Sequence, residues 1–229
     1  MPTTRRLHAA ALAIVLAACG PSAPPASATH LEGAHAPLVH RFQTAEQWAH
    51  EFDDPRRDEW QKPQEILAAM KLESGMVVAD LGAGTGYFEP WLARAVTAAG
   101  TVLALDVEPD MVRYLTERVQ REHLTNVRPA LVATDDPRLA AGSVDRILIV
   151  DTWHHIDGRE AYAGKLRDAL KSGGRVFVVD FKLDATHGPP RHHRITSEQI
   201  AHELGAAGLV VETLATTLSE QYIVAGTRR

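Results

Sequence analysis

Three glycines at two-residue intervals follow an aspartate within Val77 to Phe88, which reads VVADLGAGTGYF. The apolar residues before Asp80 predict a strand, and the pattern after the glycines predicts a helix. Glycines in such a turn adopt positive φ angles and let a ligand approach the backbone, while the helix N-terminus offers unpaired N–H groups. The stretch therefore predicts a nucleotide-binding turn built on Gly82, Gly84 and Gly86.

A second acid lies at the end of the next strand-like run. The run Gly100 to Asp106 is apolar, and its final carboxylate lies 20 residues after Gly86. A carboxylate at this position can accept hydrogen bonds from both hydroxyls of a ribose bound across the first turn. The glycines and the two acids together predict a nucleoside site at the carboxyl edge of a parallel sheet.

The residues of the turn also discriminate between two kinds of nucleotide. A dinucleotide site has the pattern G-x-G-x-x-G, but Tyr87 occupies the last glycine position here. The carboxylate of Asp80 would repel a pyrophosphate, whereas it suits a ligand with an ammonium group and no phosphate. S-adenosylmethionine (SAM) is such a ligand, so SAM is the predicted cofactor and an NAD-dependent oxidoreductase is the less favoured interpretation.

Two adjacent histidines could supply acid–base chemistry. His154 and His155 follow the apolar run 143–150, at the carboxyl end of a predicted strand, where open α/β sheets bind their ligands. A histidine there can take a proton from an acceptor group whose pKa is high. Packing within the fold is the alternative role. His155, with His154 beside it, is the candidate general base.

Three more histidines, His187, His192 and His193, lie in a loop rich in proline and arginine. No cysteine or carboxylate stands at ligand spacing beside them, so the sequence predicts no metal site and favours a polar loop on the substrate side. Arg191 and Arg194 of the same loop could clamp an anionic substrate or lie exposed as solubilising charge.

The elements that would position these residues alternate along the chain. Strands are expected at 77–81, 100–106, 126–132, 143–150 and 175–180, with helices after the first, second, fourth and fifth of them, and a hairpin is expected at 209–214 and 222–226. Lys171 to Gly174 is expected to stop a helix, and Thr196 with Gln199 to cap one. Five β/α repeats and an antiparallel ending predict an α/β fold: a doubly wound, Rossmann-like, mostly parallel sheet with an antiparallel C-terminal hairpin strand.

One or two helices are expected between Thr44 and Met70, ahead of the sheet. Thr44 and Gln47 resemble a capping box, and Pro63 suits the first turn of the second helix. These helices could pack on an edge of the sheet, or they could form a lid over the cofactor.

Composition restricts the partners of the chain. Its 229 residues are 45% hydrophobic and 23% charged, with a net charge of −5 and no basic block. This is the profile of a soluble globular domain, and it argues against nucleic acid as a partner, because phosphate binding requires a basic surface. The single cysteine, Cys19, excludes an intrachain disulfide and a cysteine-built metal site.

Residues 1–19 read as a targeting segment, with two arginines, an apolar run and small residues that end at Cys19. They resemble a bacterial lipoprotein signal, which implies a membrane anchor on Cys19. Gly20 then implies the periplasmic face of the outer membrane, in the cell envelope. Residues 20–37 would form a disordered tether, 38–74 a helical cap and 75–229 the main domain. If the cysteine is incidental, the chain would be cytoplasmic.

Residues 75–226 resemble a class I SAM-dependent methyltransferase, closest to the ubiquinone/menaquinone-biosynthesis-like group of small-molecule enzymes. Val77 to Phe88 resembles the first motif of that family, Leu105 to Met111 resembles the ribose-binding second, and Leu170 to Arg175 resembles the entry to strand five. The resemblance implies methyl transfer to a small-molecule acceptor by in-line displacement. A membrane-tethered SAM-binding protein without turnover is the alternative.

The resemblance also implies roles for individual residues. The three glycines would wrap the methionine moiety, Asp80 would orient it and Asp106 would hold the ribose. The other cofactor contacts it implies are Val107 against the adenine, Asp135 or Asp136 at the adenine amino edge, and Asp151 at the methionine end.

Overall fold

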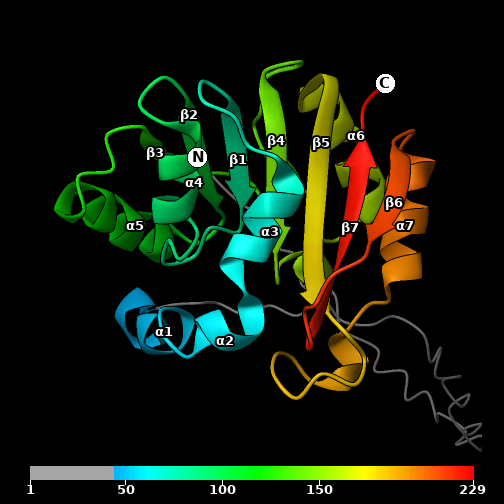
Figure 1. Ribbon diagram of the computed structural model, residues 1–229, viewed down its shortest axis with the longest axis horizontal. Coiled ribbons are helices and arrows are strands. Elements are labelled where there is room, and N and C mark those ends of the chain that lie inside the picture. Colours follow the sequence, from blue (N-terminus) through cyan, green and yellow to red (C-terminus); the bar gives the residue numbers. More distant parts are fainter. Residues whose placement is uncertain (1–43) are drawn as a thin grey trace, which may run out of the picture. The chain divides into compact units, whose positions relative to one another are not determined.

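A single seven-stranded sheet organises the chain, and helices cover both of its faces (Figure 1). The computed structural model describes residues 44–229, so the expected signal segment, tether and anchor at Cys19 lie outside the described residues. The strand order is β3-β2-β1-β4-β5-β7-β6, in which β1 to β5 are parallel and β7 is antiparallel to both of its neighbours. The predicted doubly wound α/β sheet with an antiparallel C-terminal strand is confirmed.

The strands are β1 (Val77–Leu81), β2 (Thr101–Asp106), β3 (Val127–Leu131), β4 (Val144–Val150), β5 (Leu170–Phe181), β6 (Val210–Leu214) and β7 (Gln221–Thr227). The helices are α1 (Ala45–Phe52), α2 (Arg57–Gln61), α3 (Pro63–Met70), α4 (Glu89–Val96), α5 (Pro109–Arg121), α6 (Arg159–Ala169) and α7 (Ser197–Ala206). Two short 3₁₀ helices, η1 (Trp153–His155) and η2 (Arg191–His193), follow β4 and β5.

Two apolar layers hold the helices against the sheet. The side chains of α6 and α7 pack with Ala79 and Leu81 of β1, whereas those of α3, α4 and α5 pack with Val78. Successive side chains of a strand point to opposite faces of the sheet. Asp80 therefore lies on the same face as Val78, toward α4 and α5.

The segment ahead of the sheet differs in detail from its prediction. It contains three helices, and the capping box is wrong: the Thr44 side chain makes no capping hydrogen bond, and its φ angle is 69°. The Ala45 amide instead donates to Asp110 Oδ2 at 2.7 Å, so a carboxylate from α5 caps the helix through a tertiary contact. The predicted helix start at Pro63 is confirmed.

The segment Lys171 to Gly174 belongs to a strand, which corrects the expected strand start at Arg175. The α6 helix ends at Ala169 and β5 begins at once. The Gly173 amide donates to the Arg228 carbonyl at 2.8 Å, and the Arg228 amide donates to the Gly174 carbonyl at 2.9 Å. Pairing with the end of the chain therefore extends the strand through these glycines.

The connection from β3 to β4 also differs, because residues 132–143 form no helix. A single bridge between Ala133 and Asp136 is its only regular pairing. The third of the five expected β/α repeats thus lacks a helix. The predicted cap on α7 is confirmed, since the Gln199 amide donates to Thr196 Oγ1 at 3.2 Å, and the closing hairpin of β6 and β7 is confirmed as well.

The helices α1 and α2 lie at the end of the sheet toward which β5 points (Figure 1). The carboxyl ends of all the parallel strands meet at this edge, and the loop after β5 lies there too. None of the helices in residues 44–229 combines the length and the apolarity needed to cross a membrane.

Candidate active site

Four carboxylates meet at the carboxyl edge of the sheet. Asp80 lies in β1, Asp106 ends β2, Asp151 follows β4, and Asp180 lies near the end of β5. The four strands are direct neighbours in the sheet. The structure thus brings together three predicted acids and adds Asp180, which the sequence analysis did not single out.

The glycine turn beside Asp80 has no room for side chains at two of its positions. Gly82 has a φ of +77°, and a Cβ placed on it would lie 2.2 Å from Thr152 Oγ1. Gly86 has a φ of +91°, and a Cβ there would lie 2.5 Å from a methyl group of Leu115. Any larger residue would push the turn away from β4 or α5.

Asp106 has a structural task as well as its predicted ribose contact. Its carboxylate accepts the Gly84 amide at 2.8 Å and the Glu108 amide at 2.9 Å, so it ties the two ligand-side turns together. Burial raises the pKa of Asp106, although the backbone donors oppose this rise. The neighbouring Val107 is 42% exposed, which leaves an apolar surface beside the carboxylate.

Asp80 faces a second buried acid, Glu89, which the sequence analysis missed. The exposed fractions of the two residues are 3% and 0%. Apart from a hydrogen bond shared with the Asp80 carboxyl, neither carboxylate oxygen of Glu89 has a side-chain partner among the described residues. Burial and then the neighbouring Asp80 carboxyl raise the pKa of Glu89 well above its ordinary value. Burial likewise raises the pKa of Asp80.

A helical pattern in the sequence could have revealed Glu89. The residues that α4 buries are Glu89, Leu92, Ala93 and Val96. This i, i+3, i+4, i+7 spacing is the core-facing stripe of a helix, and Glu89 occupies its first position. An acid on an apolar stripe, three residues after the last glycine of the turn, is a recognisable signal.

His154 is held by Asp180. Its Nδ1 lies 3.0 Å from both carboxylate oxygens, and the exposed fractions of the two side chains are 2% and 0%. Burial alone would lower the pKa of His154, but the hydrogen bond and charge of Asp180 outweigh it and raise the pKa. The ring of His155 lies 4.2 Å from that of His154, centroid to centroid, so the two predicted bases are adjacent in space.

Asp151 follows β4, the strand between those that carry Asp80 and Asp180. Its backbone is strained, with a φ of 52°. Gln221 of β7 donates to its Oδ1 at 2.5 Å, and Gln61 of α2 donates in turn to Gln221. Burial raises the pKa of Asp151 to about 7. The two glutamines were not predicted, because an isolated buried glutamine leaves no pattern in the sequence.

The helices α1 and α2 lie directly over the glycine turn, which favours the lid over packing on an outer strand. The Phe52 ring lies 3.7 Å from where a Cβ of Gly84 would be. Asp53 accepts a hydrogen bond from Thr85 Oγ1 at 3.1 Å. The Arg57 guanidinium lies 4.1 Å from the centroid of the Tyr87 ring, a cation–π contact.

The predicted adenine contacts Asp135 and Asp136 both lie exposed after β3. Asp136 Oδ1 accepts the Arg138 amide at 2.8 Å and closes a local turn. Lys165 of α6 donates to the Asp135 carbonyl at 2.5 Å. Both side chains therefore stay predicted contacts, with Asp136 already engaged in its own loop.

The loop after β5 is built around Arg194, which corrects its suggested role as a substrate clamp. Its guanidinium donates to five backbone carbonyls of residues 182–189, at 2.7 to 3.3 Å. His187 of this loop stacks on Trp60 of α2, with 5.1 Å between ring centroids. Within residues 44–229 no group of three or more His, Cys, Asp or Glu side chains is arranged to hold a metal ion.

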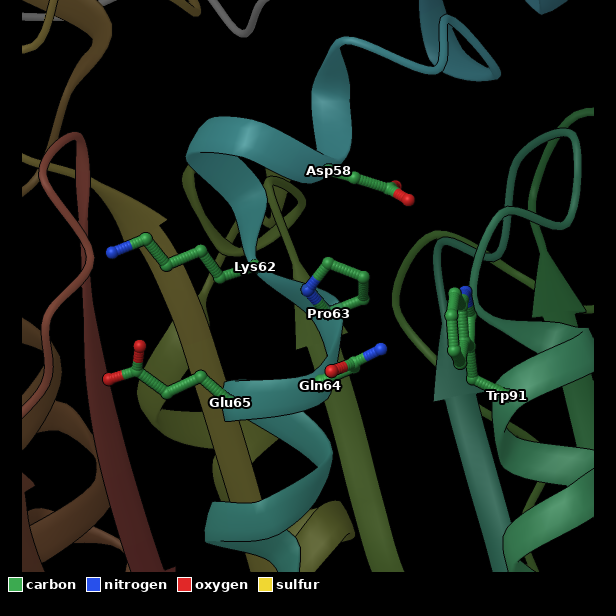
Figure 2. Close-up of a pocket in the computed structure, with 6 residues that line it drawn as sticks. All are labelled: Asp58, Lys62, Pro63, Gln64, Glu65 and Trp91. Atoms are coloured by element: carbon green, nitrogen blue, oxygen red, sulfur yellow. The ribbon is translucent and has the colours of Figure 1, made fainter.

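A surface hollow of about 390 Å³ lies elsewhere, beside α3. It is lined by Asp58, Lys62, Pro63, Gln64, Glu65 and Trp91. Figure 2 shows Trp91 of α4 across this hollow from the residues of α2 and α3. It contains neither the glycines nor the acids of the strand ends, so it is distinct from the candidate active site.

Comparison with known proteins agrees with this geometry. Residues 78–174 match the family model described as a methyltransferase domain. The chain is 27% identical over 125 residues to the methyltransferase GfsG of Streptomyces halstedii, which covers 54% of this chain and 44% of that protein. It is 26% identical over 108 residues to the ubiquinone/menaquinone biosynthesis C-methyltransferase UbiE of Idiomarina loihiensis, over 47% and 43% of the two chains. The chain thus spans less than half the length of these relatives.

Solved structures extend the likeness to 80% of this chain. A SAM-dependent methyltransferase from Aquifex aeolicus superposes with a TM-score of 0.76 and 27% identity, over 80% of this chain and 98% of that one. Phosphoethanolamine N-methyltransferase 2 of Haemonchus contortus, solved with SAM, has a TM-score of 0.62 at 17% identity, over 74% and 52% of the chains. The fold, the domain match and the relatives agree: this chain is similar to class I SAM-dependent methyltransferases.

Proposed function

We propose that the chain transfers a methyl group from SAM to a small-molecule acceptor. The observation that carries this proposal is the excess of buried carboxylate at the glycine turn, where Glu89 has no side-chain hydrogen-bond partner besides Asp80 among the described residues. A buried acid that is paired only with another acid is costly, so such a site is suited to a cationic ligand. SAM carries a sulfonium and an ammonium group, so the buried carboxyl groups of Asp80 and Glu89 fit its charge.

The residues of the turn and the next strand end would hold the cofactor. The bare backbone of Gly82 and Gly84 and the carboxylate of Asp80 lie where the methionine moiety is expected. Asp106 still has lone pairs for the ribose hydroxyls, because each of its oxygens accepts one backbone amide. The exposed side chain of Val107 offers an apolar surface for the adenine.

The bound cofactor supplies an activated methyl group, so the protein has to align the acceptor and exclude water. The lid of α1 and α2 suits the second task, since Phe52 and Arg57 cover the turn. His154 suits the removal of a proton from the acceptor. Its Nδ1 is held by Asp180, which leaves Nε2 to take the proton, and His155 beside it is the second candidate.

Calorimetry with SAM and with NAD on the full chain tests the proposal, followed by a search for methylated products among a panel of small acceptors. Binding of SAM but not NAD, with methyl transfer, is the expected result. SAM binding without transfer to any acceptor would favour a binding protein, and NAD binding alone would refute the proposal. Asp106→Asn should weaken SAM binding by about 1.5–3 kcal/mol, since a hydrogen bond to a charged group is lost.

We also propose that the chain is lipid-anchored through Cys19 in a bacterial envelope, on the strength of its first 19 residues. The mass of the purified protein should then include a lipid on an N-terminal cysteine. Cys19→Ala should move the protein out of the membrane fraction. Recovery of both proteins with an intact N-terminus in the soluble fraction would contradict the proposal.

A further inference from the structure

Asp80 and Glu89, two acids beneath the glycine turn, form a buried acidic pair. Asp80 lies on the face of β1 that packs against α4, and Glu89 lies in the first turn of α4. The residues are 3% and 0% exposed. The two carboxyl groups share a hydrogen bond, which requires a proton on one of them, and no other side chain of the described residues bonds to either oxygen of Glu89.

The cations nearest to the acidic pair are already engaged with other acids. Arg118 of α5 lies 2.8 Å from Asp53 and 2.8 Å from Glu122. Arg57 of α2 lies over the Tyr87 ring and makes only a distant ion pair with Asp151, at 3.9 Å. A third carboxylate, Asp106, adds negative charge from β2. The surroundings therefore leave the pair short of positive charge.

Elementary electrostatics limits what such a pair can do without a ligand. Transfer of an ionised carboxylate out of water is strongly unfavourable unless a charge partner or several donors accompany it. A second carboxylate nearby makes ionisation of both groups harder still. The ligand-free protein therefore keeps a proton on the acidic pair, and a cation that enters the site can replace it.

We propose that Asp80 and Glu89 together form the receptor for the α-ammonium group of the cofactor, and that the proton held by the pair passes to solvent when this group binds. The inference rests on the proposed function and deepens it by adding Glu89 to the cofactor site. Only one covalent bond changes: the carboxyl O–H bond breaks and its proton goes to the buffer. The carboxylate then accepts hydrogen bonds from the ammonium group.

The ammonium group fits the pair better than the sulfonium does. An ammonium group donates three hydrogen bonds, whereas a sulfonium has no N–H or O–H to donate, and the oxygens of Glu89 are acceptors. A Cβ on Gly86 would lie only 3.3 Å from Glu89 Oε2, so the backbone of the glycine turn comes close to these oxygens.

Proton release tests the proposal without any variant. Calorimetric titrations of the full chain with SAM, in buffers of different ionisation enthalpy at neutral pH, give the number of protons released. S-adenosylhomocysteine has the same ammonium group but no sulfonium, so it should release the same number, about one per ligand bound. Release with SAM alone would assign the pair to the sulfonium and overturn the proposal, as would release with neither ligand.

Glu89→Gln gives a second, independent readout, because it keeps the size of the side chain and removes its charge. It should weaken SAM and S-adenosylhomocysteine by roughly 10- to 100-fold and abolish proton release. The affinity for 5′-methylthioadenosine, which lacks the amino acid portion, should not change. Glu160→Gln is the matched control, since Glu160 also lies in the first turn of a helix but is exposed.

The outcomes separate this inference from the function on which it rests. If neither SAM nor S-adenosylhomocysteine binds, the proposed function fails and the inference fails with it. If both bind without proton release, and Glu89→Gln binds them as tightly as wild type, the inference alone fails. An equal loss of affinity for 5′-methylthioadenosine would show that Glu89 only supports the turn, and it would also overturn the inference.

Discussion

Two buried acidic sites lie at the same edge of the sheet, Asp180 with His154 and Asp80 with Glu89, and their charges are compensated differently. Asp180 has His154 at 3.0 Å, so its charge is balanced within the protein. Asp80 has another acid, Glu89, whose oxygens have no other side-chain partner in the described part of the chain. Since both sites are almost fully buried, solvent does not explain the difference. The fold completes one site internally and leaves the other to be completed by a ligand.

The largest effect is expected where the balanced site is broken. Asp180→Ala removes the partner of a buried histidine and should lower the free energy of unfolding by about 3–5 kcal/mol. Urea unfolding at neutral pH measures the loss. Asp168→Ala is the control, because Asp168 pairs with Arg167 at the surface with its side chain 60% exposed, and it should change stability by less than about 1 kcal/mol. Equal effects of the two variants would contradict the comparison.

The opposite sign is expected at the unbalanced site. Glu89→Gln should raise the stability of the ligand-free protein at neutral pH by about 1–3 kcal/mol, because the amide donates to Asp80 without a proton having to be held on the pair above the ordinary pKa of a carboxyl. Thermal and urea unfolding of the ligand-free protein measure the gain, with Glu160→Gln as the exposed counterpart. A variant less stable than wild type would show that Glu89 is satisfied within the protein, and the contrast between the sites would disappear.

A smaller effect is expected at Arg57, which lies between the two sites. Arg57→Ala removes a cation–π contact with Tyr87 and a hydrogen bond to the Phe52 carbonyl at 2.8 Å. The expected loss is about 1 kcal/mol of stability, concentrated in faster amide exchange of α1 and α2. Arg56→Ala is the neighbouring control, since that side chain is 83% exposed. Unchanged exchange in α1 and α2 would mean that Arg57 does not hold the lid.

Much of the fold could be predicted because its signals are local. The apolar runs that end in Asp106 and Val150 have the length of strands, and the glycine turn after Asp80 marks the first β/α unit. The β5 start was missed because its glycines pair with Arg228, at the far end of the chain. The predicted Thr44 cap was wrong for a similar reason, since Asp110 of α5 supplies the capping carboxylate.

The candidate site was predictable where residue type and spacing act together. Asp80, Asp106 and the glycines form a pattern of known meaning, and the structure places them at one edge of the sheet. Glu89 was visible in principle, as an acid on the buried stripe of α4. Asp180, Gln61 and Gln221 were not, because their roles come from contacts across the sheet with His154 and Asp151.

The finest distinction between the two acidic sites lies in the pH dependence of stability. The pKa of Glu89 is raised above its ordinary value of 4.5. As the pH rises past 4.5, the unfolded chain loses its proton while the folded chain keeps it, so stability falls toward the raised pKa of the folded state. Glu89→Gln should lack the part of this fall that Glu89 contributes, and its difference in stability from wild type should grow from pH 4.5 upward.

The site of Asp180 and His154 should change stability over a pH range that begins at a higher pH. The pKa of His154 is raised above its ordinary value of 6.5, so the stability that its proton confers is complete below 6.5 and is lost as the pH rises through the folded-state pKa. Asp180→Asn should remove this loss and leave the change in the lower range intact. Unfolding free energies of the three proteins from pH 4 to pH 9 measure both ranges. The two ranges should begin near pH 4.5 and near pH 6.5; if Asp180→Asn changed the pH dependence from 4.5 upward, the acids would titrate as one cluster, and the separation of the two sites would be wrong.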